Sequence, residues 1–204
     1  MPKPGPRKRS TTAEAALPTI VLFVEGETEG DYFTHWAARL RGKVTLNVDP
    51  DRGKDPKRVA ELAIAEAKLH RGRRGRPPTE VWCVYDVDDH HHLIDATHKA
   101  WANSVRVAIS DPCFEIWLYF HRVDQTGQIE RHKLQRETEI AIGCDKRLSR
   151  AVFDDLLPDQ PTATLRALTA YARNVLNDSL KPDDSNPSTN VWQLTTRLEA
   201  FDAQ

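Results

Sequence analysis

The alternation of short apolar segments with amphipathic segments is the feature that most limits how this 204-residue chain can fold. Apolar runs rich in β-forming residues span 19–24, 44–48, 80–89 and 105–110. A segment with apolar residues at helical spacing follows each run, most weakly after the third. Strands that alternate with helices in this way predict an α/β fold, with a mostly parallel four-stranded sheet flanked by helices.

Local signals predict where some of these helices begin and end. Thr28, with Asp31 three residues later, has the pattern of a helix N-cap. Gly42 is placed to end the same helix. Pro56 favours the first turn of the next helix, because it lacks the N–H that a helix start leaves unused.

Strand signals stop after residue 110, and the remainder is predicted to be a helical C-terminal part. Apolar residues recur at helical spacing in 111–121, 164–176 and 188–201. The stretch 122–161 is ambiguous, and we expect helices with polar loops there. Residues 181–190 are rich in Pro, Asp, Ser and Asn, which predicts a loop before the last helix.

The chain therefore divides into three expected parts. Residues 1–18, rich in Pro, Lys, Arg, Ser and Thr, predict a disordered basic tail that is either solvated or in contact with phosphates. Residues 19–121 form the α/β core, and residues 122–204 form a helical extension packed on it. Their combined length fits a single compact domain.

The composition excludes some classes of protein. The formal net charge is −1, so no global basic character indicates nucleic acid, although this balance is compatible with a local basic patch. The 3 cysteines lie far apart without metal-binding spacing, which favours a reducing, cytoplasmic location. No apolar run approaches the length of a membrane span, and the N-terminus lacks the pattern of a secretory signal.

Acidic residues follow two of the predicted strands. Glu25 and Glu29 lie after the first run, and Asp86 and Asp88 close the third. The ends of parallel strands meet at one edge of the sheet, where ligands bind, and residues i and i+2 of an extended segment point the same way. Either acidic cluster alone is also typical of a helix cap or a solvated loop. Together they favour a hard divalent cation such as Mg²⁺, which would relieve their repulsion.

Two motifs in these clusters resemble a known domain. VEGETE after the first run and YDVDD in the third resemble the signature of Toprim domains, which occur in topoisomerases, bacterial primases and OLD-family nucleases. The segments VEGETEGDYF, VWCVYDVDDH, SDPCFEIWLYFH and NPSTNVWQL more specifically resemble the RloB family, Toprim-like proteins of bacterial defence loci. Asp111 departs from the family pattern, where Asn is expected, and Val87 stands where the family often has a basic residue.

The resemblance implies a Toprim-like sheet and roles for the acids. Glu25 would act as a general acid or base or as a metal ligand, while Asp86 and Asp88 would bind the metal. Glu29 would hold a second ion. Mg²⁺ or Mn²⁺ is the implied cofactor, because phosphodiester cleavage needs a positioned water and neutralised phosphoryl oxygens, both of which carboxylate-bound divalent ions supply.

Further residues near the expected site are accessory candidates. They are Asp89, Ser110, Asp111, Glu115 and His121. Asp111 and Glu115 share a helix face at i, i+4, and the sequence leaves open whether Glu115 is a ligand or the partner of an arginine. His121 ends the same predicted helix, where it either complements the helix dipole or takes part in catalysis.

Two basic groups are candidates for contacts with a nucleic-acid backbone. Lys54 and Lys57 follow the second run, at the functional edge of the expected sheet. Arg71, Arg73 and Arg74 form a dense cluster, and Arg suits forked contacts with phosphate. The alternative for both groups is an ordinary solvated loop.

Acidic strand ends and family resemblance together favour a metal-dependent nuclease of bacterial anti-phage defence, acting on DNA or RNA. The alternative is a non-catalytic metal- or nucleic-acid-binding subunit that docks on a partner ATPase of the AAA or ABC type. Such a partner is suggested by the genes that neighbour those of the resembled family. The chain has no Walker lysine loop of its own. Nucleotidyl transfer is a weaker option, and the sequence leaves the oligomeric state open.

Overall fold

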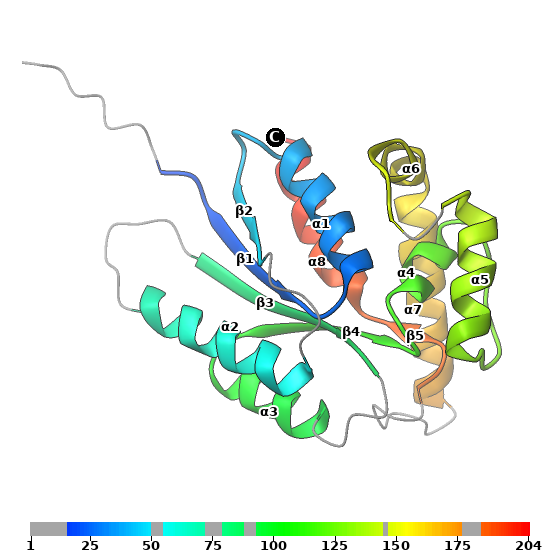
Figure 1. The fold of residues 1–204 in the computed structure, drawn as a ribbon, viewed down its shortest axis with the longest axis horizontal. Helices are drawn as coiled ribbons and strands as arrows, with labels where there is room; N and C mark the ends of the chain where they lie inside the picture. The colour runs from blue at the N-terminus through cyan, green and yellow to red at the C-terminus, as the bar shows by residue number, and fades with distance from the viewer. Residues whose placement is uncertain (1–15, 50–54, 72–78, 88–92, 145–146, 177–184) are drawn as a thin grey trace, which may run out of the picture.

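The computed structural model describes residues 16–49, 55–71, 79–87, 93–144, 147–176 and 185–204. Its centre is a five-stranded sheet with the strand order β2-β1-β3-β4-β5 (Figure 1). The strands are β1 (Thr19–Val24), β2 (Thr45–Val48), β3 (Thr79–Asp86), β4 (Arg106–Asp111) and β5 (Ser188–Thr189). The predicted α/β class and the first four strands are confirmed.

The first four strands are parallel, and the fifth is antiparallel to β4. β5 pairs Thr189 with Ser110 and Ser188 with Asp111. The prediction of four strands, with a loop over 181–190, is therefore wrong for Ser188 and Thr189. A strand of two residues in a segment rich in Pro and Asn has no local pattern, and only its pairing with β4 defines it.

Helices cover both faces of the sheet (Figure 1). α2 (Pro56–His70) and α3 (Leu93–Ala102) pack on one face, and α1 (Glu27–Arg39) and α8 (Val191–Asp202) pack on the other. Alternate strand residues serve the two faces, because side chains of a strand point in turn to opposite sides. In β1, for example, Leu22 belongs to the core under α1, whereas Val21 packs under α2.

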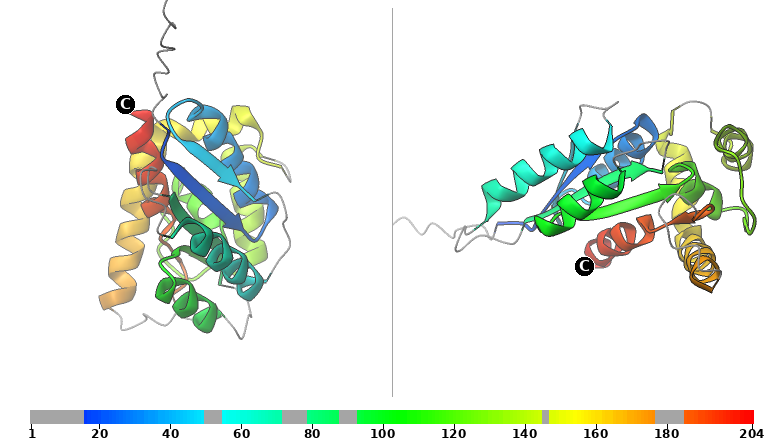
Figure 2. Two further views of the ribbon diagram at one scale, coloured as in Figure 1. Left: turned by 90° about the vertical axis from the view of Figure 1, so that its left-hand side faces the viewer. Right: turned by 90° about the horizontal axis from the view of Figure 1, so that it is seen from below.

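The helical C-terminal part lies beyond the ends of the parallel strands (Figure 2). It contains α4 (Glu115–Phe120), α5 (Arg131–Ile142), α6 (Arg150–Leu156), a short 3₁₀ turn (Leu157–Asp159) and α7 (Gln160–Leu176). α4 packs between α5 and α7. Its aromatic residues share one core with α1. In this core, Phe114, the residue before α4, meets the Tyr32 ring edge to face at 5.6 Å between centroids.

The start of α1 differs from the prediction. The helix begins at Glu27 with Gly26 as its N-cap, and no side chain caps it. Thr28 is therefore not the N-cap, and its hydroxyl instead donates to Glu115 Oε1 at 3.2 Å. A long-range hydrogen bond to α4 thus replaces the local contact that the sequence pattern indicated.

Candidate functional site

The acidic residues that the sequence singled out converge where the parallel strands end, which we call the carboxyl edge. Glu25 follows β1 directly, and Asp86 is the last residue of β3, its neighbour in the sheet. Glu29 lies in the first turn of α1, and Glu115 is the first residue of α4. The two helices begin at this edge, so strand ends and helix starts bring four carboxylates together.

Backbone pairing fixes the position of Glu25 over the end of β3. The Glu25 N–H donates to the Val84 carbonyl at 3.1 Å, which continues the ladder between β1 and β3. The Asp86 N–H in turn donates to Glu25 Oε2 at 3.3 Å. The Glu25 side chain therefore lies against the backbone of Asp86.

Gly26 makes room for Glu29. Its backbone is extended, with φ −107° and ψ 177°, a conformation open to any residue. A Cβ at this position would lie only 2.5 Å from Glu29 Oε2. A side chain at position 26 would therefore displace the Glu29 carboxylate, which is only 3% exposed.

Burial and mutual repulsion make the carboxylates of Glu29 and Asp86 hard to ionise. Burial, with the nearby charges of Glu115 and Glu25, raises the pKa of Glu29 to about 7. Burial also raises the pKa of Asp86 well above its usual range, with further contributions from Glu29 and Glu115. The positive charge of Arg131 acts in the opposite direction. The site therefore favours bound cations or protons over empty, fully ionised carboxylates.

Arg131 is a member of the site that the sequence did not indicate. It is the first residue of α5, and its Nη2 lies 3.4 Å from Asp86 Oδ2. The other oxygen, Asp86 Oδ1, is buried and accepts no hydrogen bond within the described part of the chain. One oxygen of Asp86 thus faces an arginine, while the other lacks the partner that a buried carboxylate oxygen needs.

The donor set fits a hard divalent cation. Every charged acceptor in the cluster is a carboxylate oxygen, the ligand type of Mg²⁺, Mn²⁺ and Ca²⁺. The buried Oδ1 of Asp86 is an acceptor that such an ion would satisfy. Among the described residues, no group of three or more His, Cys, Asp or Glu side chains is already in ligating geometry. The predicted ligand Asp88 lies outside those residues.

The basic candidates fall at different places. Lys57 is exposed in the first turn of α2, which begins after β2 and so at the carboxyl edge. Arg71 follows the end of α2 at the opposite edge of the sheet, where it donates to the Asn103 carbonyl at 2.8 Å. The other three basic candidates and the acidic candidate Asp89 lie outside the described residues. These three are Lys54, Arg73 and Arg74.

Ser110 and Asp111 are both buried and contact the segment that forms β5. The Ser110 hydroxyl is 2.9 Å from Thr189 Oγ1. Asp111 Oδ2 accepts hydrogen bonds from the Ser185 N–H and hydroxyl, each at 3.0 Å. These contacts hold residues 185–189 against the end of β4, which is how a carboxylate at position 111 is accommodated.

His121 is buried at the C-terminal end of α4, the opposite end from Glu115. Its Nδ1–H donates to the Trp117 carbonyl at 2.9 Å, and its ring meets the Trp117 ring edge to face. Burial lowers the pKa of His121 to about 4, so the ring is neutral at physiological pH. This environment is that of a packed core histidine.

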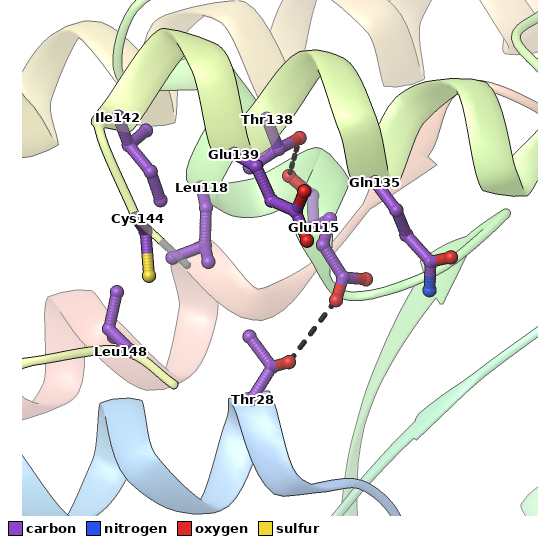
Figure 3. Close-up of a pocket in the computed structure, with 9 residues that line it drawn as sticks. All are labelled: Thr28, Glu115, Leu118, Gln135, Thr138, Glu139, Ile142, Cys144 and Leu148. Carbon is purple, nitrogen blue, oxygen red and sulfur yellow. Dashed lines mark hydrogen bonds between the residues drawn. The ribbon is translucent and has the colours of Figure 1, made fainter. Parts of the chain in front are cut away.

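A cavity adjoins the carboxylates on the side of α5 (Figure 3). Glu115 lines it, and Gln135 and Glu139 of α5 face it. The segment of α5 was ambiguous in the sequence, although the αL C-cap Gly143 is the kind of signal that marks a helix end. No local pattern indicates that α5 lies beside the end of β3.

Comparison with protein families gives one result. The sequence model of the RloB-like protein family matches residues 20–198. The chain belongs to this family. The RloB-like match begins within β1 and ends within α8, so it includes the sheet, the carboxylates and the helical part. No curated protein and no solved structure matched the chain.

The RloB-like match confirms the resemblance to the RloB family that was drawn from the sequence motifs. Within the described residues, no helix has the length and apolar character that crossing a bilayer requires. Cys83 and Cys113 are buried free thiols, and Cys144 is partly buried, with its thiol donating to the Arg147 carbonyl at 3.2 Å.

Proposed function

We propose that this RloB-like chain is a divalent-metal-dependent nuclease that hydrolyses phosphodiesters in the bacterial cytoplasm as part of anti-phage defence. The observation that carries the proposal is the convergence of Glu25, Glu29, Asp86 and Glu115 at the carboxyl edge, where a buried oxygen of Asp86 has no donor among the described residues. Family membership supports the nuclease class and the defence role by resemblance.

Glu25 and Asp86 are the residues that would hold Mg²⁺ or Mn²⁺, with Glu29 beside them. When bound, such an ion neutralises charge on the phosphoryl oxygens and activates a water. Glu29, whose pKa burial raises to about 7, can hold or release a proton near neutral pH. Arg131 lies beside Asp86 and can pair with a substrate phosphate.

The test is cleavage of labelled single-stranded and duplex DNA and RNA in Mg²⁺ or Mn²⁺. We expect Glu25→Gln and Asp86→Asn to lose at least about a hundredfold in rate, because each removes a charge from the catalytic centre. Glu27→Gln is the matched control, since Glu27 lies in the same turn but is exposed and pairs with Arg147 at 3.2 Å. Its activity should equal that of the wild type.

Equal cleavage by the wild type and both site variants would refute the nuclease proposal. Metal-dependent binding of nucleic acid without cleavage of any substrate would instead support the non-catalytic subunit, which would then need its partner ATPase. A partner ATPase and the choice between DNA and RNA remain predictions from the sequence.

A further inference from the structure

The cavity beside the carboxylates lies between the start of α1, α4, α5 and the segment that follows α5 (Figure 3). Its volume is about 250 Å³, below the range of ~300–1,000 Å³ that is common for drug-sized ligands. Glu115 belongs both to this cavity and to the carboxylate cluster. An occupant would therefore be small, and it would lie next to whatever the carboxylates engage.

The lining has two chemically different sides (Figure 3). The apolar side consists of Leu118, Ile142, Cys144 and Leu148. The polar side consists of Thr28, Glu115, Gln135, Thr138 and Glu139. A flat apolar body with a polar rim matches such a lining, because one face can pack on the aliphatic side chains while its edge meets the polar groups.

The polar side offers hydrogen-bond acceptors above all. The carboxylates of Glu115 and Glu139 supply acceptor oxygens, and Gln135 adds an amide oxygen. Thr28 already donates to Glu115 Oε1, and Thr138 already donates to the Glu115 carbonyl at 3.5 Å. A phosphate would be repelled by the two carboxylates, whereas a neutral group that donates hydrogen bonds would be attracted.

We propose that this cavity binds one unpaired nucleobase that carries an exocyclic amino group, next to the phosphate that is cut. The inference rests on the proposed nuclease function and specifies its substrate. An amino-bearing base presents donors to Glu139, as carboxylates accept from the cytosine amino group in other complexes. A base within a duplex has this edge paired and its faces stacked, so the substrate is single-stranded or locally unpaired.

Cys144 provides a direct measure of occupancy. It lines the cavity and is partly exposed, whereas Cys83 and Cys113 are fully buried. Alkylation of Cys144 by N-ethylmaleimide, followed by mass spectrometry, therefore reports on this cavity. The probes are CMP and UMP in Mg²⁺, which differ in the amino group and contain no phosphodiester to be cleaved.

We expect CMP to slow alkylation of Cys144 at about a tenfold lower concentration than UMP, because contact with the wrong base edge typically costs a factor on the order of ten in affinity. Glu139→Ala should abolish the difference. Glu61→Ala, which removes the same charge from the surface of α2, should retain it. Glu139 is exposed, and Glu61 is only partly buried, in an ion pair with Arg58 at 3.7 Å, so neither change removes a core contact.

Equal protection by CMP and UMP, no protection by either, or an unchanged preference in Glu139→Ala would overturn the proposal. These outcomes are separable from those of the nuclease assay. Cleavage that depends on Glu25 and Asp86 without nucleotide protection rejects the base site alone. Protection with a preference for CMP in a protein that cuts no substrate rejects the nuclease and leaves the base site.

Discussion

At the scale of the residue, the ionisation of the Asp86 carboxyl group is subject to two opposed electrostatic effects. Its Oδ2 faces Arg131 at 3.4 Å, and its buried Oδ1 has no donor among the described residues. The arginine stabilises the ionised carboxylate, while Glu29 and Glu115 oppose ionisation. A divalent cation at this position would compete with Arg131 for the same carboxylate.

The variant Arg131→Gln should therefore change binding and catalysis in opposite directions. Divalent-metal affinity should rise about threefold to tenfold, because a nearby positive charge is removed. The cleavage rate at saturating metal should fall on the order of a hundredfold if the guanidinium stabilises the phosphate. Calorimetric titration with Mn²⁺ and single-turnover cleavage measure the two effects.

Arg136→Gln is the control for this prediction, since Arg136 is exposed on the same helix. It should leave both quantities unchanged. Weaker metal binding by Arg131→Gln would contradict the competition and would instead indicate that Arg131 orients Asp86 for the metal.

Because His121 is buried, we expect the folding stability to depend on pH through this residue, independently of the carboxylates at the carboxyl edge. Burial lowers its pKa from 6.5 to about 4, so in this interval the unfolded chain binds a proton that the folded chain does not. The contribution of the neutral His121 ring to the free energy of unfolding is therefore fully present above about pH 6.5. It is lost as the pH falls toward 4. Between pH 7 and pH 5 the loss is about 2 kcal/mol.

The variant His121→Asn removes this titration, and its side-chain amide can still donate to the Trp117 carbonyl. The free energy of unfolding, measured with urea at pH 5 and pH 7, should fall less for the variant than for the wild type over this interval. Identical pH dependence of the two proteins would show that His121 is solvated rather than buried.

At the scale of the element, α7 shows how packing selects a helix face. Leu165 and Leu168 contributed to the spacing that predicted this helix, yet Leu165 is 65% exposed. Buried apolar positions of this helix include Ala163, Ala167 and Ala170, each at most 2% exposed. Small residues allow α7 to approach α4 and the start of α8 closely, so the larger side chains lie outside.

The variant Ala167→Leu should accordingly lower the free energy of unfolding by about 1–3 kcal/mol, because a fully buried position has no room for added methylenes. Leu165→Gln should change it by less than about 0.5 kcal/mol, as is usual for exposed positions. Guanidinium denaturation followed by tryptophan fluorescence gives both values. The reverse order would mean that α7 presents its leucines to the core.

At the scale of the whole molecule, the carboxyl edge affects both the folding stability and the proposed function. β1, β3, α1 and α4 each place a carboxylate there, so their repulsion acts across the sheet and the helical part. A cation bound at this edge would link elements far apart in the sequence. Metal binding should therefore be visible as a change in global stability.

Mg²⁺ at about a hundredfold excess over its dissociation constant should stabilise the wild type by about 2.7 kcal/mol. Asp86→Asn should be more stable than the wild type without metal, by roughly 1 kcal/mol, because a neutral amide is cheaper to bury than a carboxylate. It should gain little from Mg²⁺. Thermal unfolding with and without Mg²⁺ measures both effects, and NaCl at equal ionic strength controls for screening.

A stabilisation by Mg²⁺ that persists unchanged in Asp86→Asn would place the cation elsewhere. The same measurement on Glu27→Gln should match the wild type, since this exposed residue lies outside the cluster.

Much of the fold and part of the site could be predicted because their signals are local. The run at 19–24 matches β1 because its apolar residues are consecutive, and Glu25 and Asp86 could be located because they directly follow such runs. β5 could not be predicted, since two residues become a strand only through pairing with β4. Arg131 and Glu139 could not be placed either, because no short-range pattern specifies where α5 packs.

The sequence by itself determined the α/β alternation, the family and the acidic strand ends, since spacing and hydrophobicity act within a few residues. Only the tertiary structure decided that Thr28 bonds to Glu115, that Arg131 faces Asp86 and that an acceptor-lined cavity adjoins the carboxylates. The physical reason is that these contacts join segments tens of residues apart. Their geometry depends on how helices and sheet pack, which no single segment encodes.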